Sequence, residues 1–166
     1  MARAPWPKER YPTSAELEGH GFGNLALLGH PSLLFFGYSN CPDVCPTTLA
    51  TIQAALRGSR VTGLRVVFVT VDPERDTPAA LESYLRAFGG QVVGLYGDHA
   101  ALAPLARSLG ALAERRDGPA GGGRIEHTAT LYLLDGKGRM AAVFTPPIAA
   151  AALGADLATL AKASIL

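Results

Sequence analysis

The chain has 166 residues, with 15 Lys and Arg against 14 Asp and Glu. This length suits one domain with a substantial core and no need for a disulfide framework. A net charge of +1 leaves no basic excess to neutralise a phosphate backbone, so nucleic acid is not expected as a partner. The longest apolar stretch, Leu25–Tyr38, is interrupted by a Gly-His-Pro sequence and is shorter than the roughly 20 apolar residues of a membrane span.

The start of the chain differs in composition from the rest. Residues 1–15 contain three prolines and mixed charges without an apolar period, which predicts a flexible arm or linker. We expect a single domain over residues 16–166. The start also lacks a basic segment followed by an apolar one, the pattern of an export signal.

The first part of this domain alternates between predicted strands and helices. The strands are short apolar runs rich in β-branched residues, and the helices have apolar residues three or four positions apart. In chain order these elements are a strand at 32–38, a helix at 46–57, a strand at 64–71, a helix at 77–88, a strand at 92–96 and a helix at 98–109. Gly58 is expected to end the first helix, and Thr77 with Pro78 to begin the second.

The second part begins with a glycine-rich segment at 117–124, for which we expect a mobile loop. Apolar runs at 127–134 and 139–144 flank Asp-Gly-Lys-Gly and predict a β-hairpin. An alanine-rich helix is expected at 148–163. The whole order predicts an α/β domain with a mixed central sheet, helices on both faces, and a C-terminal β-hairpin plus helix.

The two cysteines, Cys41 and Cys45, lie where the first strand leads into the first helix. On a regular helix, residues four positions apart have Cβ atoms about 5–6 Å apart, which suits a shared metal better than a disulfide. Pro46 disfavours helical geometry at Cys45, so we expect the helix to begin at Pro46 with both thiols on the preceding turn. Amide hydrogens and the helix dipole there should lower the pKa of both thiols.

A close cysteine pair without further cysteines indicates metal binding or dithiol redox chemistry, with two packed cysteines as the less informative alternative. Thiolates select Cu(I), Zn(II) or iron–sulfur clusters, and two cysteines cannot provide the four thiolates of a cluster. A structural zinc site needs four protein ligands. Cu(I) accepts fewer ligands, so the pair favours copper and leaves zinc open.

Three motifs carry a resemblance to a known family. Residues 36–49, FGYSNCPDVCPTTL, closely resemble the signature of the Sco/SenC family of copper proteins. Residues 69–78, VTVDPERDTP, and 126–135, EHTATLYLLD, resemble the second and third motifs of that family in the same order. Two features depart from its pattern. Glu126 stands where an Asp is usual, and the segment Phe22–Pro31 is short for the β-hairpin that precedes the first core strand.

The resemblance implies a thioredoxin-like fold and delivery of copper to the binuclear site in subunit II of cytochrome c oxidase. It also implies an amino-terminal membrane anchor, which these residues do not contain, and a domain on the outer, periplasmic face of the cytoplasmic membrane. The expected partners are subunit II, a thiol reductant for the cysteine pair and another copper carrier. The expected cargo is Cu(I), and Cu(II) is also considered.

The third motif makes His127 the copper ligand beside the two cysteines. We assign no role to the other histidines, which are His20, His30 and His99. Asp72 of the second motif is expected either to orient the His127 ring as a neighbouring carboxylate that does not bind the metal or to cap its own turn. Arg75 and Asp76 of the same motif are expected to pair with each other or to contact a partner protein.

Three functions remain open at this point. The first is a copper metallochaperone holding one ion between Cys41, Cys45 and His127. The second is a thiol–disulfide reductase in which Cys41 and Cys45 are a redox-active dithiol that keeps the cysteines of oxidase subunit II reduced. His127 separates these two, because only copper binding needs it. A peroxide sensor is the third, but the chain lacks the Thr and Arg that normally surround a peroxidatic cysteine.

Overall fold

The structure is a computed structural model that describes residues 29–89, 92–97, 99–111, 113–116, 124–127 and 129–166. The strands are β1 (Ser32–Gly37), β2 (Arg65–Thr70), β3 (Val92–Leu95), β4 (Ala113–Arg116), β5 (Arg124–His127), β6 (Leu131–Leu134) and β7 (Met140–Phe144). The helices are α2 (Val44–Ser59), α3 (Pro78–Arg86), α4 (His99–Ser108) and α5 (Ala150–Lys162).

Five strands form the central sheet in the order β3-β2-β1-β6-β7. The first three are parallel, with Gly37 of β1 beside Thr70 of β2. β6 runs antiparallel to both β1 and β7. Crossover connections through helices are required between parallel strands, and α2 and α3 provide them. The predicted mixed sheet and the C-terminal hairpin followed by a helix are confirmed.

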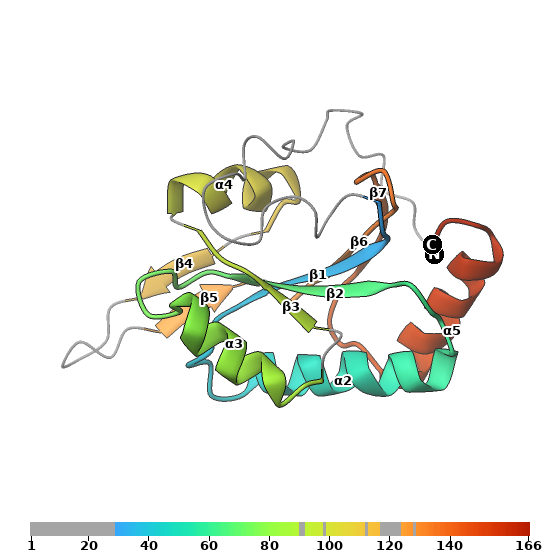
Figure 1. Ribbon diagram of the computed structural model, residues 1–166, viewed down its shortest axis with the longest axis horizontal. Helices are drawn as coiled ribbons and strands as arrows, with labels where there is room; N and C mark the ends of the chain where they lie inside the picture. The colour runs from blue at the N-terminus through green and yellow to red at the C-terminus, as the bar shows by residue number, and fades with distance from the viewer. Residues whose placement is uncertain (1–28, 90–91, 98, 112, 117–123, 128) are drawn as a thin grey trace.

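The sheet has helices on both faces, as predicted (Figure 1). Alternate residues of β1 point to opposite sides because side chains alternate along a strand: Leu33 and Phe35 belong to one buried cluster, and Leu34 and Phe36 to the other. The first cluster packs against α2, α3 and α5, and the second packs against α4. Both faces of β1 are therefore covered, which explains its continuous apolar sequence.

The helix that carries Cys45 begins earlier than predicted. α2 begins at Val44 rather than at Pro46, and it continues through Gly58 to Ser59. Pro46 stands in the first turn, where its missing N–H would have had no partner within the helix. The chain leaves the helix at Arg60, whose φ of 56° is left-handed. The start of α3 matches the prediction, since the Thr77 hydroxyl accepts a hydrogen bond from the Ala80 N–H.

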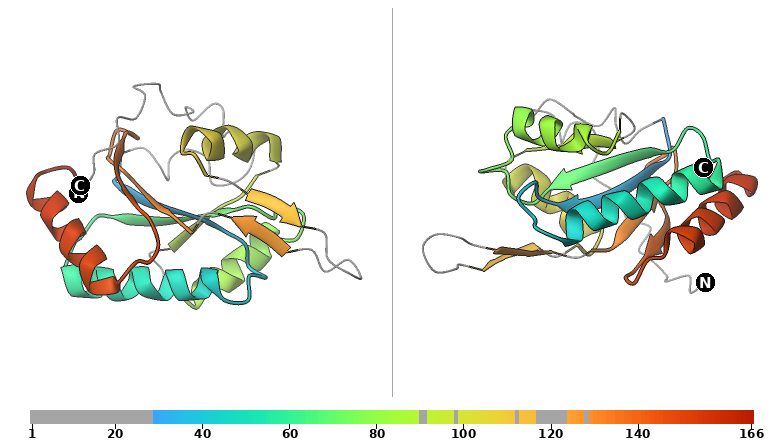
Figure 2. Two further views of the ribbon diagram at one scale, coloured as in Figure 1. Left: turned by 180° about the vertical axis from the view of Figure 1, so that it is seen from behind. Right: turned by 90° about the horizontal axis from the view of Figure 1, so that it is seen from below.

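A second, two-stranded sheet was not predicted. β4 pairs antiparallel with β5, with Ala113 beside His127. The predicted strand at 127–134 is thus two strands, and β5 belongs to the separate sheet. Figure 2 shows β4 and β5 projecting from the end of the domain. The expected arm at 1–15, the start of the domain at residue 16 and most of the short segment at 22–31 lie outside the described residues. So does the expected loop at 117–124 except for Arg124, which begins β5. Among the described residues, no helix has the length and apolar character of a membrane span.

Candidate metal centre

Cys45 is held from two sides. It stands in the first turn of α2 and is 0% exposed. Its sulfur packs against the end of β1, where Gly37 has no side chain. A Cβ built on Gly37 would lie 2.8 Å from the Cys45 Sγ and 2.8 Å from the Phe68 ring. This position therefore needs glycine because the sulfur and the ring approach the strand backbone closely.

Cys41 lies on the loop between β1 and α2 and is partly exposed. Its backbone N–H donates to the Tyr38 carbonyl at 3.1 Å, which closes a turn directly after the strand. The carboxyl end of β1 and the amino end of α2 thus place both thiols at one end of the central sheet.

His127 is the last residue of β5 and reaches the thiols from the second sheet. Its ring packs edge-on against Phe35 of β1, at 6.0 Å between ring centroids, and against Tyr38, which follows that strand, at 5.8 Å. Its Nε2 atom lies 3.3 Å from the Cys45 Sγ. The two aromatic rings therefore orient the imidazole toward the cysteine.

The structure brings the three predicted ligands together. One ligand atom from each of Cys41, Cys45 and His127 lies within 4.8 Å of the others. Bonds of about 2.3 Å to sulfur and about 2.0 Å to nitrogen could span the 3.3 Å between Cys45 Sγ and His127 Nε2 through one ion. Two sulfurs and one imidazole suit copper or zinc, and three protein ligands fall short of the four of a structural zinc site.

The two thiols differ in acidity, whereas we expected both pKa values to fall. Burial raises the pKa of Cys41, but hydrogen bonds from the Cys45 side chain and from the N–H groups of residues 43–45 outweigh burial and lower it overall. Burial raises the pKa of Cys45 strongly, and the neighbouring Cys41 and Asp76 raise it further. The amide groups at the amino end of α2 therefore lower the pKa of the partly exposed Cys41, whereas burial dominates the pKa of Cys45.

The charged residues of the second motif pair differently from the expectation. Arg75 Nε donates to Asp72 Oδ2 at 2.6 Å, so the expected pair between Arg75 and Asp76 is wrong. The Arg75 and Asp76 N–H groups donate to the Asp72 carbonyl, which places Asp72 as the cap of its own turn. Its role in orienting His127 stays a prediction. Asp76 turns inward to Ser39 and Thr70.

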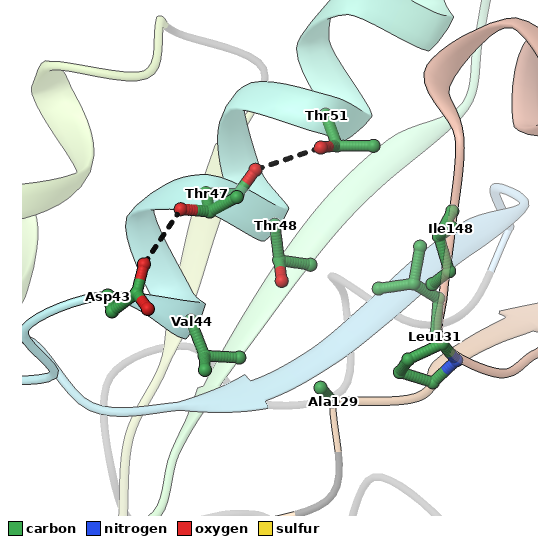
Figure 3. A pocket seen from close by; sticks show the side chains of 9 residues that line it. Asp43, Val44, Thr47, Thr48, Thr51, Ala129, Leu131 and Ile148 are labelled. Carbon is green, nitrogen blue, oxygen red and sulfur yellow. Dashed lines mark hydrogen bonds between the residues drawn. The ribbon is translucent and has the colours of Figure 1, made fainter.

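A hollow of about 240 Å³ lies against the first turns of α2 and has no counterpart in the sequence prediction. Figure 3 shows its wall on α2, where the Thr47 hydroxyl donates to Asp43 at 3.4 Å and the Thr51 hydroxyl donates to the Thr47 carbonyl at 3.0 Å. The opposite wall comes from segments around β6 and before α5 and is made of Ala129, Leu131, Pro146 and Ile148. Asp43 and Val44 lie between the two cysteines in sequence, but neither cysteine is among the residues that line the hollow.

The other histidines take no part in this cluster as far as the structure describes them. His30 is exposed at the entrance to β1. His20 precedes the described residues, and His99 begins α4.

Comparisons with known proteins show which family this chain is similar to. The family model SCO1/SenC matches residues 13–162. The SCO2-like protein RC0895 of Rickettsia conorii is 32% identical over 125 residues, which cover 73% of this chain and 61% of the relative. The chain thus spans about three fifths of the length of that relative.

Two solved structures with copper bound have the same fold. ScoI of Bradyrhizobium japonicum is 37% identical, with a TM-score of 0.74 over 87% of this chain and 90% of that one. Yeast Sco1 is 28% identical, with a TM-score of 0.76 over 88% of this chain and 83% of that one. From the family match and these likenesses, the chain belongs to the SCO1/SenC family of thioredoxin-like proteins.

Proposed function

We propose that this domain, residues 16–166, is a copper metallochaperone that binds one copper ion between Cys41, Cys45 and His127. The observation that carries the proposal is the convergence of two sulfurs and one imidazole nitrogen within 4.8 Å. The copper bound in the Bradyrhizobium and yeast relatives supports it. Two thiolates suit Cu(I), and the imidazole adds a ligand that Cu(II) also accepts.

The proposed recipient is the binuclear copper site of subunit II of cytochrome c oxidase, which the family resemblance implies. We propose that an amino-terminal anchor holds the domain on the outer face of the cytoplasmic membrane. Another copper carrier would load the site after a thiol reductant has reduced the cysteines. Transfer would proceed by ligand exchange, in which a sulfur of the recipient replaces one protein ligand at a time.

Metal analysis of the anaerobically reduced chain tests the copper site. We expect one Cu(I) per chain in competition with a chromophoric chelator, and loss of tight binding in Cys41→Ser and in Cys45→Ser because a hydroxyl is a poor ligand for Cu(I). His30→Ala is the matched control, since it removes an exposed imidazole outside the cluster. Tight stoichiometric copper in either serine variant would refute the site.

Oxidation offers a second check of the same ligands. Formation of the disulfide between Cys41 and Cys45 consumes both sulfurs, so copper uptake should disappear after mild oxidation and return after reduction. Equal uptake by the oxidised and reduced chain would count against a site built on these thiols.

A thiol–disulfide reductase is the second candidate, and the opposite pKa directions of the two thiols favour it. The Cys41 thiolate would attack a target disulfide, form a mixed disulfide and release one target thiolate. Cys45, after losing its proton, would then attack Cys41, close the internal disulfide and release the second target thiolate. An external thiol would return both cysteines to the reduced state.

His127→Ala separates the two candidates. A metallochaperone loses or strongly alters its Cu(II) site in this variant, while a two-sulfur Cu(I) site persists. A reductase keeps its rate on a target disulfide, because the imidazole is not the attacking group. If His127→Ala supports normal assembly of the oxidase copper site while Cys41→Ser does not, the metallochaperone assignment is wrong.

A further inference from the structure

A buried acidic side chain stands directly behind the cysteine loop. Asp76 is 2% exposed, and within the described residues its partners are hydroxyl and backbone N–H groups rather than a Lys or an Arg. Its carboxyl oxygens accept hydrogen bonds from the Ser39 N–H at 3.1 and 3.2 Å, from the Ser39 hydroxyl, and from the Thr70 hydroxyl at 2.7 Å. A buried carboxyl group is tolerated where hydrogen bonds satisfy it, and these donors do so.

These hydrogen bonds join two strand ends. Ser39 belongs to the loop that follows β1, two residues before Cys41. Thr70 is the last residue of β2, the register partner of Gly37 at the end of β1. The Thr70 hydroxyl also accepts from the Asp72 N–H at 3.0 Å. The loop that carries Cys41 is thereby fixed to the turn between β2 and α3, across 37 residues of sequence.

The two cysteines do not depend on this link equally. Cys45 is held by α2 and by its packing against Gly37 and Phe68. Cys41 precedes the helix and is partly exposed. On the helix side, its sulfur is held by hydrogen bonds from Cys45 and from the N–H groups of residues 43–45. On the strand side, the loop is held by the turn that the Cys41 N–H closes with Tyr38 and by the hydrogen bonds from Ser39 to Asp76.

We propose that Asp76 is a positioning residue that fixes Cys41 relative to Cys45 and His127. It accepts the hydrogen bonds of the cysteine loop and contributes no ligand of its own. In the copper-binding reading this inference rests on the proposed function, because the position of Cys41 then sets how well three ligands meet one ion. The pairing of the two thiols with each other does not require copper and gives an independent measurement.

The experiment measures the equilibrium of the purified chain with reduced and oxidised glutathione. One glutathione disulfide oxidises the Cys41–Cys45 dithiol and yields two glutathione thiols. Loss of the hydrogen bonds to Asp76 frees the cysteine loop and so lowers the effective concentration of Cys41 near Cys45. We expect the equilibrium constant for disulfide closure to fall about tenfold, a shift of about 30 mV to a less negative potential for a two-electron couple.

Three variants and one control make this test specific. Asp76→Asn removes the carboxylate, while Thr70→Val removes one of its donors without changing any charge, so a shift in both is not a charge effect. Thr70→Ser keeps the hydroxyl and should restore the wild-type potential. Leu157→Ala, in the buried face of α5, destabilises the fold without touching the loop and should leave the potential unchanged.

An unchanged potential in both Asp76→Asn and Thr70→Val overturns the proposal, as does an equal shift in Leu157→Ala. Competition for Cu(I) on the same proteins is the second measurement. We expect the affinity for Cu(I) to be about tenfold weaker in Asp76→Asn and in Thr70→Val. If the wild-type chain binds no copper while the potentials shift as expected, the proposed function fails and the positioning role of Asp76 stands.

Discussion

Gly37→Ala is the sharpest test of how the strand end shapes the metal centre. The added methyl group would lie 2.8 Å from the Cys45 Sγ, 2.8 Å from the Phe68 Cζ and 2.9 Å from a second atom of that ring. Ordinary contacts between such atoms begin near 3.4 Å, so both side chains must shift by several tenths of an ångström. Cys45 and Phe68 are both fully buried, and interiors at native packing density leave little room for such a shift.

Overpacking of a well-packed core costs about 1–3 kcal/mol. Replacing glycine by alanine also restricts the unfolded chain, which offsets about 0.4–1 kcal/mol of that cost. We therefore expect Gly37→Ala to lower the free energy of unfolding by about 1–2 kcal/mol. The same shift moves the Cys45 sulfur relative to the His127 Nε2, now 3.3 Å away, so the affinity for copper should fall as well.

The assay is denaturant unfolding of the reduced chain, followed by competition for Cu(I). Gly58→Ala is the matched control, because a Cβ at Gly58 meets nothing within 4 Å and the residue lies inside α2. That control should gain up to about 1 kcal/mol from the better helix propensity of alanine. A Gly37→Ala variant as stable as the wild type, with unchanged copper affinity, would refute the close packing described here.

Three further predictions follow from the same structure. The pKa of Cys41 is lowered and that of Cys45 is raised from 9.0, so iodoacetamide should modify Cys41 first. Peptide mass mapping should show this order, and the rate at Cys41 should reach half its maximum below pH 9.0. Burial raises the pKa of Asp135, but hydrogen bonds from the 137–139 turn outweigh burial and lower it below 3.8. Asp135→Asn should therefore cost about 1–2 kcal/mol at neutral pH, and its difference from wild type in acid titrations should vanish as pH falls through that lowered pKa. Gly154→Ala places a Cβ 2.9 Å from the Ala55 carbonyl oxygen, so it should separate α5 from α2 and lower the melting temperature, whereas an unchanged melting temperature would contradict that contact.

The sequence alone predicted the elements that depend on local patterns. The strands at 32–37 and 65–70 are apolar and β-branched, and the start of α3 follows from Thr77 and Pro78. The two cysteines were found from their spacing. His127 stood out from the other histidines because it opens a predicted strand directly after the glycine-rich segment, and the family motif then made it the copper ligand.

The remaining features depend on contacts distant in sequence. β4 has the sequence Ala-Glu-Arg-Arg, which lacks the apolar alternation of a strand, and its pairing with β5 could not be read from it. Asp76 finds its partners 37 and six residues away, whereas the adjacent Arg75 offered a simpler local pair. The opposite pKa directions of the thiols depend on which sulfur is buried, and that depends on the packing around Gly37.

The candidate metal centre takes its sulfurs from the loop and helix that follow β1 and its nitrogen from β5. This division has a thermodynamic consequence. Unfolding carries His127 away, because 82 residues separate it from Cys45. It leaves Cys41 and Cys45 four positions apart, so the denatured chain keeps a two-sulfur chelate for Cu(I). A ligand that also binds the denatured chain stabilises the fold by less than its full binding free energy. Copper should therefore raise the free energy of unfolding only by the difference between two binding free energies, that of the folded site and that of a short Cys-Pro-Asp-Val-Cys peptide. This difference comes from the imidazole and from the preformed geometry.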